Sequence, residues 1–270
     1  MRLLLPLVAA GVLLTSCAED PPPDALPLGI PSWSDTVYVT PRPWASPQDN
    51  PLYAAPRVTV SCPLSRTRDS TWASIKKYLN AVSACLDRTW KAEFDRIGVS
   101  FWAPNRTFVR APQVDPLCGL MPHDGASGTY CAAGGLFSVD VGRLADDPGT
   151  IAFMTTVVAH EYGHHIQRLS QIDRFPDPVT AGTPGVEGAH LSSRRFELQA
   201  ECLAGVALNA MKDDLPTWQR FRENYGGTLS QQWVLDHGHL ATQLRWLEKG
   251  FRSGKPGACD TWSATAGDVT

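Results

Sequence analysis

The chain contains His160-Glu161-Tyr162-Gly163-His164, an HExxH sequence, and further along it carries Glu197-Leu198-Gln199-Ala200-Glu201-Cys202. In a helix, residues four positions apart project from one face, so the two motif histidines can direct imidazole nitrogens at the same ion. The residues at 151–159 are mostly apolar, which predicts a buried helix over about 149–171. Gly163 costs helix stability relative to alanine, which makes physical sense if something must approach the backbone of this helix closely.

The second stretch supplies the ligand that the first lacks. A catalytic zinc site takes three protein ligands and leaves one position open for water. Glu197 lies in a further helical segment, predicted over 193–211, and we expect His160, His164 and Glu197 to hold one Zn²⁺ per chain. Asp173 is an alternative third ligand, but it lies in a proline-rich turn region and ranks below Glu197.

Three more residues have predicted roles around the metal. Glu161 is placed to take a proton from zinc-activated water and to return it to the leaving amine. Glu201, one helical turn beyond Glu197, can accept the second ring N–H of a ligand histidine and so fix its tautomer. His237 is a candidate hydrogen-bond donor to the developing oxyanion. The alternative for His237 is an ordinary histidine on the polar face of a C-terminal helix.

The N-terminus has the pattern of an export signal. Arg2 precedes an apolar run at 3–14, which is too short to span a membrane comfortably. Leu14-Thr15-Ser16-Cys17 resembles a bacterial lipobox, in which cleavage precedes a cysteine that is then acylated. We expect 1–16 to be a signal peptide and Cys17 to anchor the exported protein to the extracytoplasmic face of the cell membrane. Ordinary signal cleavage without acylation is the alternative.

Residues 17–57 are rich in proline and are predicted to form an extended linker. The alternative is an arm packed along the domain, in which Tyr53 and other aromatic residues dock. The remaining residues, 58–270, are enough for one domain with a substantial core. A formal net charge of −3 offers no basic surface for nucleic acid.

The cysteines fit an oxidising compartment. Of the seven cysteines, six remain beyond Cys17, and an even number in an exported domain suggests three disulfides with fifteen connectivities. The preferred pairs, in order, are Cys118–Cys131, Cys202–Cys259 and Cys62–Cys85. The first pair depends on short spacing around a turn, and the others depend only on elimination. A Cys202 thiol ligand is a further alternative.

The motifs together resemble those of the bacterial neutral zinc metallopeptidase family. The matching stretches are Cys118-Gly119, 128–131, 158–167, 196–205, His237-Gly238 and Arg245-Trp246, and the resemblance covers roughly 60–262. It implies peptidase activity and an arrangement similar to the gluzincins, with Glu197 as the third ligand. The chain departs from the family at Glu201, where relatives usually have Asp, and at 132–135, where they tend to have Pro and a polar turn.

The expected fold class is α+β, a mainly helical zincin-like domain with a small antiparallel sheet and the zinc between the two motif helices. Helices are expected over 70–97, 149–171, 193–211 and 230–250, and short extended runs at 99–102, 107–109 and 136–141. The run at 136–141 is a candidate edge strand that could pair with an extended peptide.

We therefore predict an exported, lipid-anchored zinc metallopeptidase, monomeric, acting on peptide or protein substrates and with no nucleic-acid partner. One alternative is a metal-binding or scaffold lipoprotein whose peptidase fold has lost activity, but the presence of Glu161 argues against it. Another alternative is a zinc amidase that acts on a non-protein amide. It uses the same metal chemistry and stays open.

Overall fold

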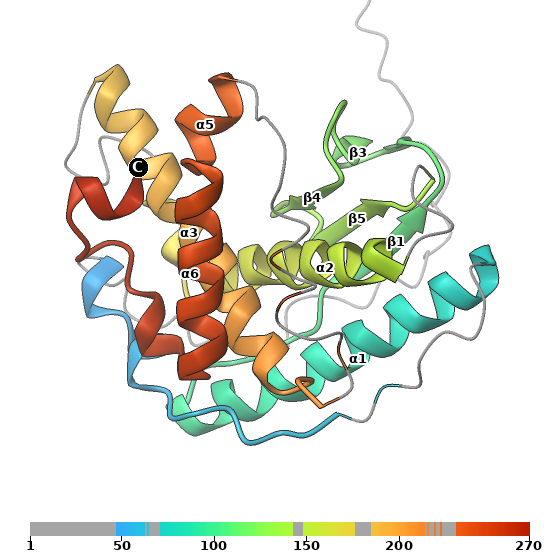
Figure 1. Cartoon of the computed structure of the whole chain (residues 1–270), viewed down its shortest axis with the longest axis horizontal. Coiled ribbons are helices and arrows are strands. Elements are labelled where there is room, and N and C mark those ends of the chain that lie inside the picture. The colour runs from blue at the N-terminus through green and yellow to red at the C-terminus, as the bar shows by residue number, and fades with distance from the viewer. Residues whose placement is uncertain are drawn as a thin grey trace, which may run out of the picture. The chain divides into compact units, whose positions relative to one another are not determined.

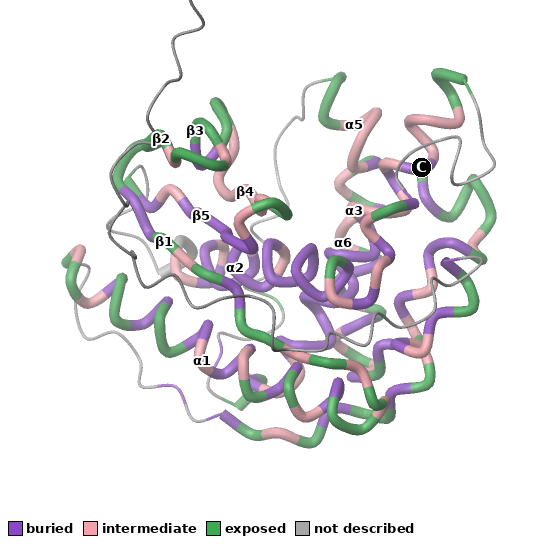
Figure 2. Tube along the Cα trace, turned by 180° about the vertical axis from the view of Figure 1, so that it is seen from behind, coloured by how far each residue is buried: buried purple, intermediate pink, exposed green. Residues whose placement is uncertain are grey.

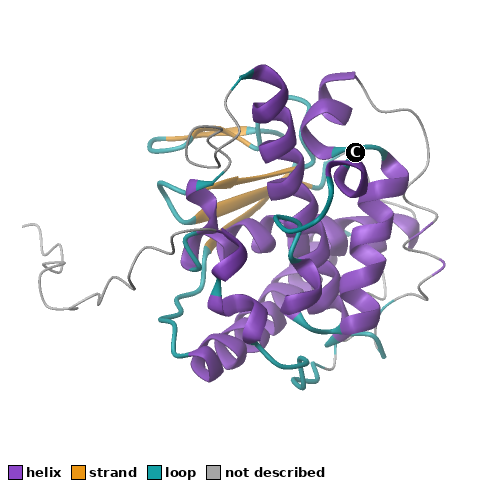
Figure 3. Ribbon diagram, turned by 90° about the vertical axis from the view of Figure 1, so that its left-hand side faces the viewer, coloured by secondary structure: helices purple, strands orange, loops and turns teal. Residues whose placement is uncertain are grey.

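A computed structural model describes residues 47–62, 64, 71–142, 148–175, 185–213, 215, 219, 222 and 231–270 of the chain. This part is mainly helical, with a small sheet beside the helices (Figures 1 and 3), which is the predicted α+β fold class. The predicted signal peptide 1–16, the acylation site Cys17 and the linker as far as residue 46 lie outside the described residues. Within the described part, no helix is both long and apolar enough to cross a membrane.

Helices α2 (Pro148–Leu169) and α3 (Val186–Asn209) are the two predicted motif helices, and α3 begins earlier than expected. They pack directly on each other. At Gly163, an added Cβ would lie 2.7 Å from the carbonyl oxygen of Ala200. The close approach expected at Gly163 is therefore made by the backbone of α3. Figure 2 shows that α2 is buried along most of its length.

The small sheet packs against α2. Its order is β1 (Asn105–Val109), β5 (Leu136–Asp140) and β4 (Gly128–Cys131), with β4 antiparallel and β1 parallel to β5, so the sheet is mixed. The prediction that 136–141 forms an edge strand is wrong, because β5 is central. Four consecutive residues of β5 are buried, as expected of a strand with neighbours on both sides. The edge strand beside α2 is β4.

A second, two-stranded sheet is formed by β2 (Gln113–Asp115) and β3 (Gly119–Met121). The predicted extended run at 99–102 is not a strand; these residues lie in an irregular segment between α1 (Trp72–Ile97) and β1. The hydroxyl of Thr71 caps the start of α1, close to the start predicted for the helix over 70–97.

The single helix predicted over 230–250 is wrong, because the structure has two helices there, α5 (Gln231–His237) and α6 (Leu240–Ser253). Gly238 separates them with a φ of 78°, a left-handed conformation that ends helices. Both helices pack against α3. The break leaves His237 as the last residue of α5.

Residues 47–57 pack against the domain, so the predicted extended linker does not continue to residue 57. Leu52 is completely buried, and the side-chain amide of Asn50 donates a hydrogen bond of 2.8 Å to the carbonyl oxygen of Ser170, just after α2. Buried apolar surface and a paired amide outweigh the tendency of a proline-rich segment to stay extended. The packed-arm alternative therefore describes 47–57.

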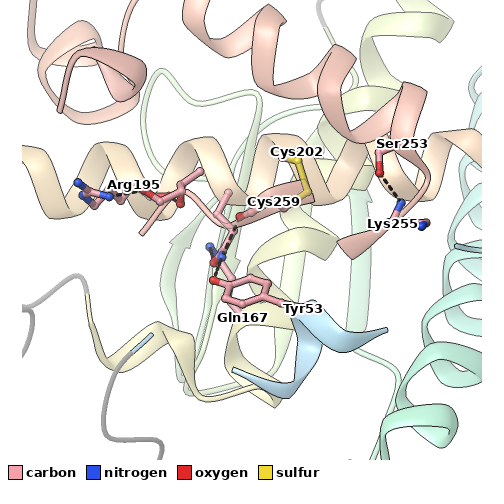
Figure 4. Close-up of a disulfide and its surroundings, with 9 residues drawn as sticks. Tyr53, Gln167, Arg195, Cys202, Ser253, Lys255 and Cys259 are labelled. Carbon is pink, nitrogen blue, oxygen red and sulfur yellow. Dashed lines mark hydrogen bonds between the residues drawn. A yellow bond between two sulfur atoms is a disulfide. The ribbon is translucent and has the colours of Figure 1, made fainter. Parts of the chain in front are cut away.

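The three disulfides of the structure are the three preferred pairs, Cys118–Cys131, Cys202–Cys259 and Cys62–Cys85. The first joins the β2–β3 hairpin to β4, and the second attaches the C-terminal segment to α3 (Figure 4). Because the sulfur of Cys202 is bonded to Cys259, it is not a thiol ligand.

The short 3₁₀ helices are η1 (Pro47–Asp49), η2 (Pro51–Ala54), η3 (Ile172–Arg174), η4 (Pro256–Cys259) and η5 (Ala266–Val269).

Candidate metal centre

The crossing of α2 and α3 brings three of the predicted residues together. The Nε2 atoms of His160 and His164 are 3.2 Å apart. Oε2 of Glu197 lies 3.3 Å from the first and 3.2 Å from the second. Among the described residues, these three form the one group of His, Cys, Asp or Glu side chains whose ligand atoms lie close enough to hold a metal ion.

The geometry and chemistry of these atoms fit zinc. Four ligands at 2.0–2.1 Å around a tetrahedral ion are separated from one another by about 3.3–3.4 Å. The three separations between the ligand atoms of His160, His164 and Glu197 are 3.2–3.3 Å. Within the described residues, the buried Oε2 atom of Glu197 has no well-aligned hydrogen-bond donor, although two imidazole nitrogens lie close to it. A buried carboxylate oxygen without an aligned donor, flanked by two imidazole nitrogens, is the arrangement that a cation would satisfy.

Two side chains orient the imidazoles. Oε2 of Glu201 lies 2.8 Å from Nδ1 of His160, the type of contact predicted from the sequence. Oε1 of Gln167 lies 2.9 Å from Nδ1 of His164, and this partner was not predicted. Its signal was available, because residue 167 is three positions after residue 164 and so shares its helix face. In both cases an acceptor at Nδ1 leaves the lone pair of Nε2 free to face the ion.

The charges of the site are strongly coupled. Burial disfavours the charged form of His160, but the adjacent carboxylates of Glu197 and Glu201 outweigh it and raise the pKa of this imidazole well above its usual value. Burial likewise disfavours the charged form of Glu197, but the imidazoles of His164 and His237 lower the pKa of this carboxyl well below its usual range. The carboxylate is therefore held in its ionised, metal-binding form.

Glu161 is buried beside the ligands but is not one of the group. Burial raises the pKa of its carboxyl, although His160 and His164 act in the opposite direction. A carboxylate with a raised pKa is a better proton acceptor near neutral pH. Strand β4 runs directly against it: a Cβ added to Gly128 would lie 2.6 Å from Oε1 of Glu161.

His237 also reaches this centre. Its Nε2 atom lies 3.3 Å from Oε2 of Glu197, and its ring stacks on Trp233 with centroids 3.8 Å apart. Burial lowers the pKa of His237, which favours the neutral imidazole. The structure thus places His237 at the centre rather than on an outward polar face of the C-terminal helices.

These side chains line a cleft of about 900 Å³. Its floor is α2, one wall is β4 with the loop before it, and the other wall comes from α3, α5 and α6. In Figure 1, α5 and β4 both lie above α2, with α5 to the left and β4 to the right. Apolar lining side chains include Phe153, Val157, Phe196, Trp233 and Leu240. A substrate of peptide size would contact both walls.

Asp173, the alternative third ligand, lines the cleft but is not part of the ligand group. Its carboxylate pairs with Arg168 at 2.9 Å. The preference for Glu197 over Asp173 therefore agrees with the geometry.

A paired-histidine helix that meets a glutamate from a second helix above a small sheet defines a zincin-like class of metal-binding domain. Residues 55–224 match the family described as "Putative neutral zinc metallopeptidase", and the chain belongs to this family.

The chain is also similar to bacterial proteins. The chain is 26% identical over 206 residues to the "Uncharacterized protein YpfJ" of Escherichia coli (strain K12), a match that covers 69% of this chain and 71% of the relative. It is 31% identical over 139 residues to the "Uncharacterized protein Rv2575" of Mycobacterium tuberculosis (strain H37Rv), covering 40% of this chain and 43% of the relative. No solved structure matches the chain.

The two carboxylates of α3 are expected to differ in their effect on metal binding. Glu197→Ala should lose zinc, because it removes a ligand, whereas Glu201→Ala should weaken zinc affinity by about 10- to 100-fold through misorientation of His160. The exposed Glu187 of the same helix provides a control, Glu187→Ala, with wild-type affinity. Titration against a competing chelator measures all three. Equal, mild losses in the first two variants would place the third ligand elsewhere.

Proposed function

We propose that this protein is a zinc-dependent metallopeptidase that hydrolyses peptide bonds with Glu161 as the general base. The observation that carries the proposal is the convergence of His160, His164 and Glu197 beside the buried carboxylate of Glu161, in a cleft large enough for a peptide. When bound, zinc would polarise the scissile carbonyl and lower the pKa of an attacking water to roughly 7.

Glu161 is suited to two proton transfers. With its pKa raised by burial, it accepts a proton from the attacking water and then donates it to the nitrogen of the leaving amine. Because Glu161 follows His160 directly on a buried helix, its distance from the reacting water is fixed by the same frame that fixes the ligands.

Strand β4 offers an edge for an extended substrate. The carbonyl of Ser127 accepts a hydrogen bond from the N–H of Asp140, so the alternation of an antiparallel pair directs the backbone groups of Gly128 and Tyr130 away from β5. We infer that a peptide chain pairs with these groups, which would place its scissile bond next to Glu161. The edge predicted for β5 is thus supplied by β4.

His237 faces the reacting group from the opposite wall. As a neutral imidazole held against Trp233, it can donate a hydrogen bond to the oxygen that gains negative charge during attack. The donor is pre-positioned, because stacking and burial restrict the ring.

Glu161→Gln is expected to keep one zinc per chain and to lower peptide hydrolysis by about 100- to 10,000-fold, since an amide cannot accept the proton. Metal content by mass spectrometry and digestion of a peptide library, with and without a chelator, measure both properties. Cleavage by this variant at the wild-type rate would contradict the role of Glu161. A zinc-loaded wild type that cleaves no peptide would overturn peptidase activity and favour the scaffold or amidase alternatives.

His237→Phe is expected to keep zinc and lower kcat by about 100- to 1,000-fold, with a smaller change in KM, because the donor acts mainly in the transition state. The exposed residue His239, two positions later, provides a matched control, His239→Ala, with wild-type kinetics. An unchanged kcat in His237→Phe would refute the role as oxyanion donor.

Gly128→Ala is expected to keep zinc but to lower turnover by roughly 100-fold, because its Cβ would displace the carboxylate of Glu161 by close contact. Gly267→Ala is the control, since a Cβ at that position meets no atom closer than 3.9 Å. Steady-state kinetics and zinc content distinguish the two variants. Wild-type turnover in Gly128→Ala would show that β4 does not constrain the base.

A further inference from the structure

His164 is connected to residues far from the cleft by a chain of buried amides. Nδ1 of its ring meets Oε1 of Gln167 at 2.9 Å. Gln167 is completely buried between α2 and α3. This arrangement differs from that of His160, whose Nδ1 meets the carboxylate of Glu201. One ligand histidine is thus oriented by a charged acceptor and the other by a neutral one.

The direction of the Gln167 amide is fixed by two acceptors. Its Nε2 donates to the carbonyl oxygen of Phe196 at 2.7 Å and to Oε1 of Gln199 at 3.0 Å. Rotation of the amide by 180° would place its oxygen against both of these oxygens and leave them without a donor. Oε1 therefore stays toward His164, and the ring nitrogen that faces it must carry the proton.

The side-chain amide of Gln199 is also oriented by two acceptors, one from the N-terminal part of the domain and one from its C-terminal part. Its Nε2 donates to the hydroxyl of Tyr53 at 2.7 Å and to the carbonyl oxygen of Cys259 at 3.2 Å. Cys259 is bonded to Cys202, three residues after Gln199 on α3. Figure 4 shows Tyr53 and Gln167 beside this disulfide. Tyr53 itself is kept in place by the packed segment 47–57, in which the neighbouring Leu52 is fully buried.

We propose that Gln167 is a positioning residue for the metal centre, which keeps His164 in the tautomer with its proton on Nδ1. Gln199, held by Tyr53 and Cys259, keeps Gln167 in the required direction. This inference rests on the proposed zinc site. It makes the segment 47–57 part of the support of that site, although the segment does not reach the cleft.

These hydrogen bonds predict which substitutions lower zinc affinity most. Loss of Gln167 removes the acceptor of His164 directly. Loss of the Tyr53 hydroxyl removes one of two acceptors of Gln199, and Gln167 is still oriented by Phe196. Zinc affinity should therefore fall most in variants of Gln167 and least in Tyr53→Phe.

The experiment measures zinc affinity of the full chain by competition with a chelator. Gln167→Met, which keeps the length but has no acceptor, is expected to bind zinc about 10- to 100-fold more weakly. Tyr53→Phe should lose about threefold or less. Asn209→Leu is the control, because it removes a partly buried amide contact between α3 and the carbonyl oxygen of Phe251 that has no link to His164.

A second readout separates positioning from general stability. In the zinc-loaded wild type, ¹⁵N NMR of the histidine rings should show His164 with its proton on Nδ1. In metal-free Gln167→Met, the same ring should show a mixture of tautomers, whereas metal-free Asn209→Leu should match the wild type. Wild-type affinity in Gln167→Met, or an equal loss in Asn209→Leu, would overturn the role of Gln167. A wild type that takes up no zinc would instead overturn the metal centre itself.

Discussion

The contact on which the site depends is the close crossing of α2 and α3 at Gly163. Any side chain at this position would meet the backbone of Ala200, so the two helices could not keep their present separation. Glu197 lies one helical turn before Ala200, and its carboxylate reaches the two imidazoles of α2 only at this separation. The intrinsic cost of glycine in a helix is about 1 kcal/mol. Here it is offset by the packing that the crossing permits.

The crossing also concentrates negative charge. Glu161, Glu197 and Glu201 are all largely buried around the same cleft, and among the described side chains that line it the imidazoles are the only compensating groups. Unpaired buried carboxylates are costly, and the opposite pKa shifts of His160 and Glu197 show that attraction between imidazoles and carboxylates outweighs the cost of burial. A divalent cation would compensate the same charges, which is why the electrostatics and the geometry indicate the same ligand.

The sequence was most informative where a position requires one particular residue type for a chemical or steric reason. The spacing of His160 and His164, the carboxylate of Glu197 and the need for close approach at Gly163 all follow from local rules. The sequence was least informative about neighbours in space. Whether a short apolar strand such as β5 is central or at an edge depends on strands elsewhere in the chain. The buried contact of Gln167 is likewise made by residues of α3 that no local pattern identifies. A single glycine such as Gly238 is tolerated within a helical pattern, so it does not by itself identify the break between α5 and α6.

Two successive residues of α2, His164 and His165, are hydrogen-bonded toward the elements that form the two walls of the cleft. His164 is linked through Gln167 to α3, and His165 is linked to the sheet, because its Nε2–H donates to the carbonyl of Trp102 and its Nδ1 accepts from the hydroxyl of Tyr130 on β4. Burial lowers the pKa of His165 to about 4, so near neutral pH the ring is uncharged and can both donate and accept. One turn of helix therefore sets the position of the metal ligands and of the strand edge together. A shift of α3 would therefore move the ligand His164, and a shift of the sheet would move its neighbour His165. Close packing and cross-linking of the segments behind the cleft limit both shifts.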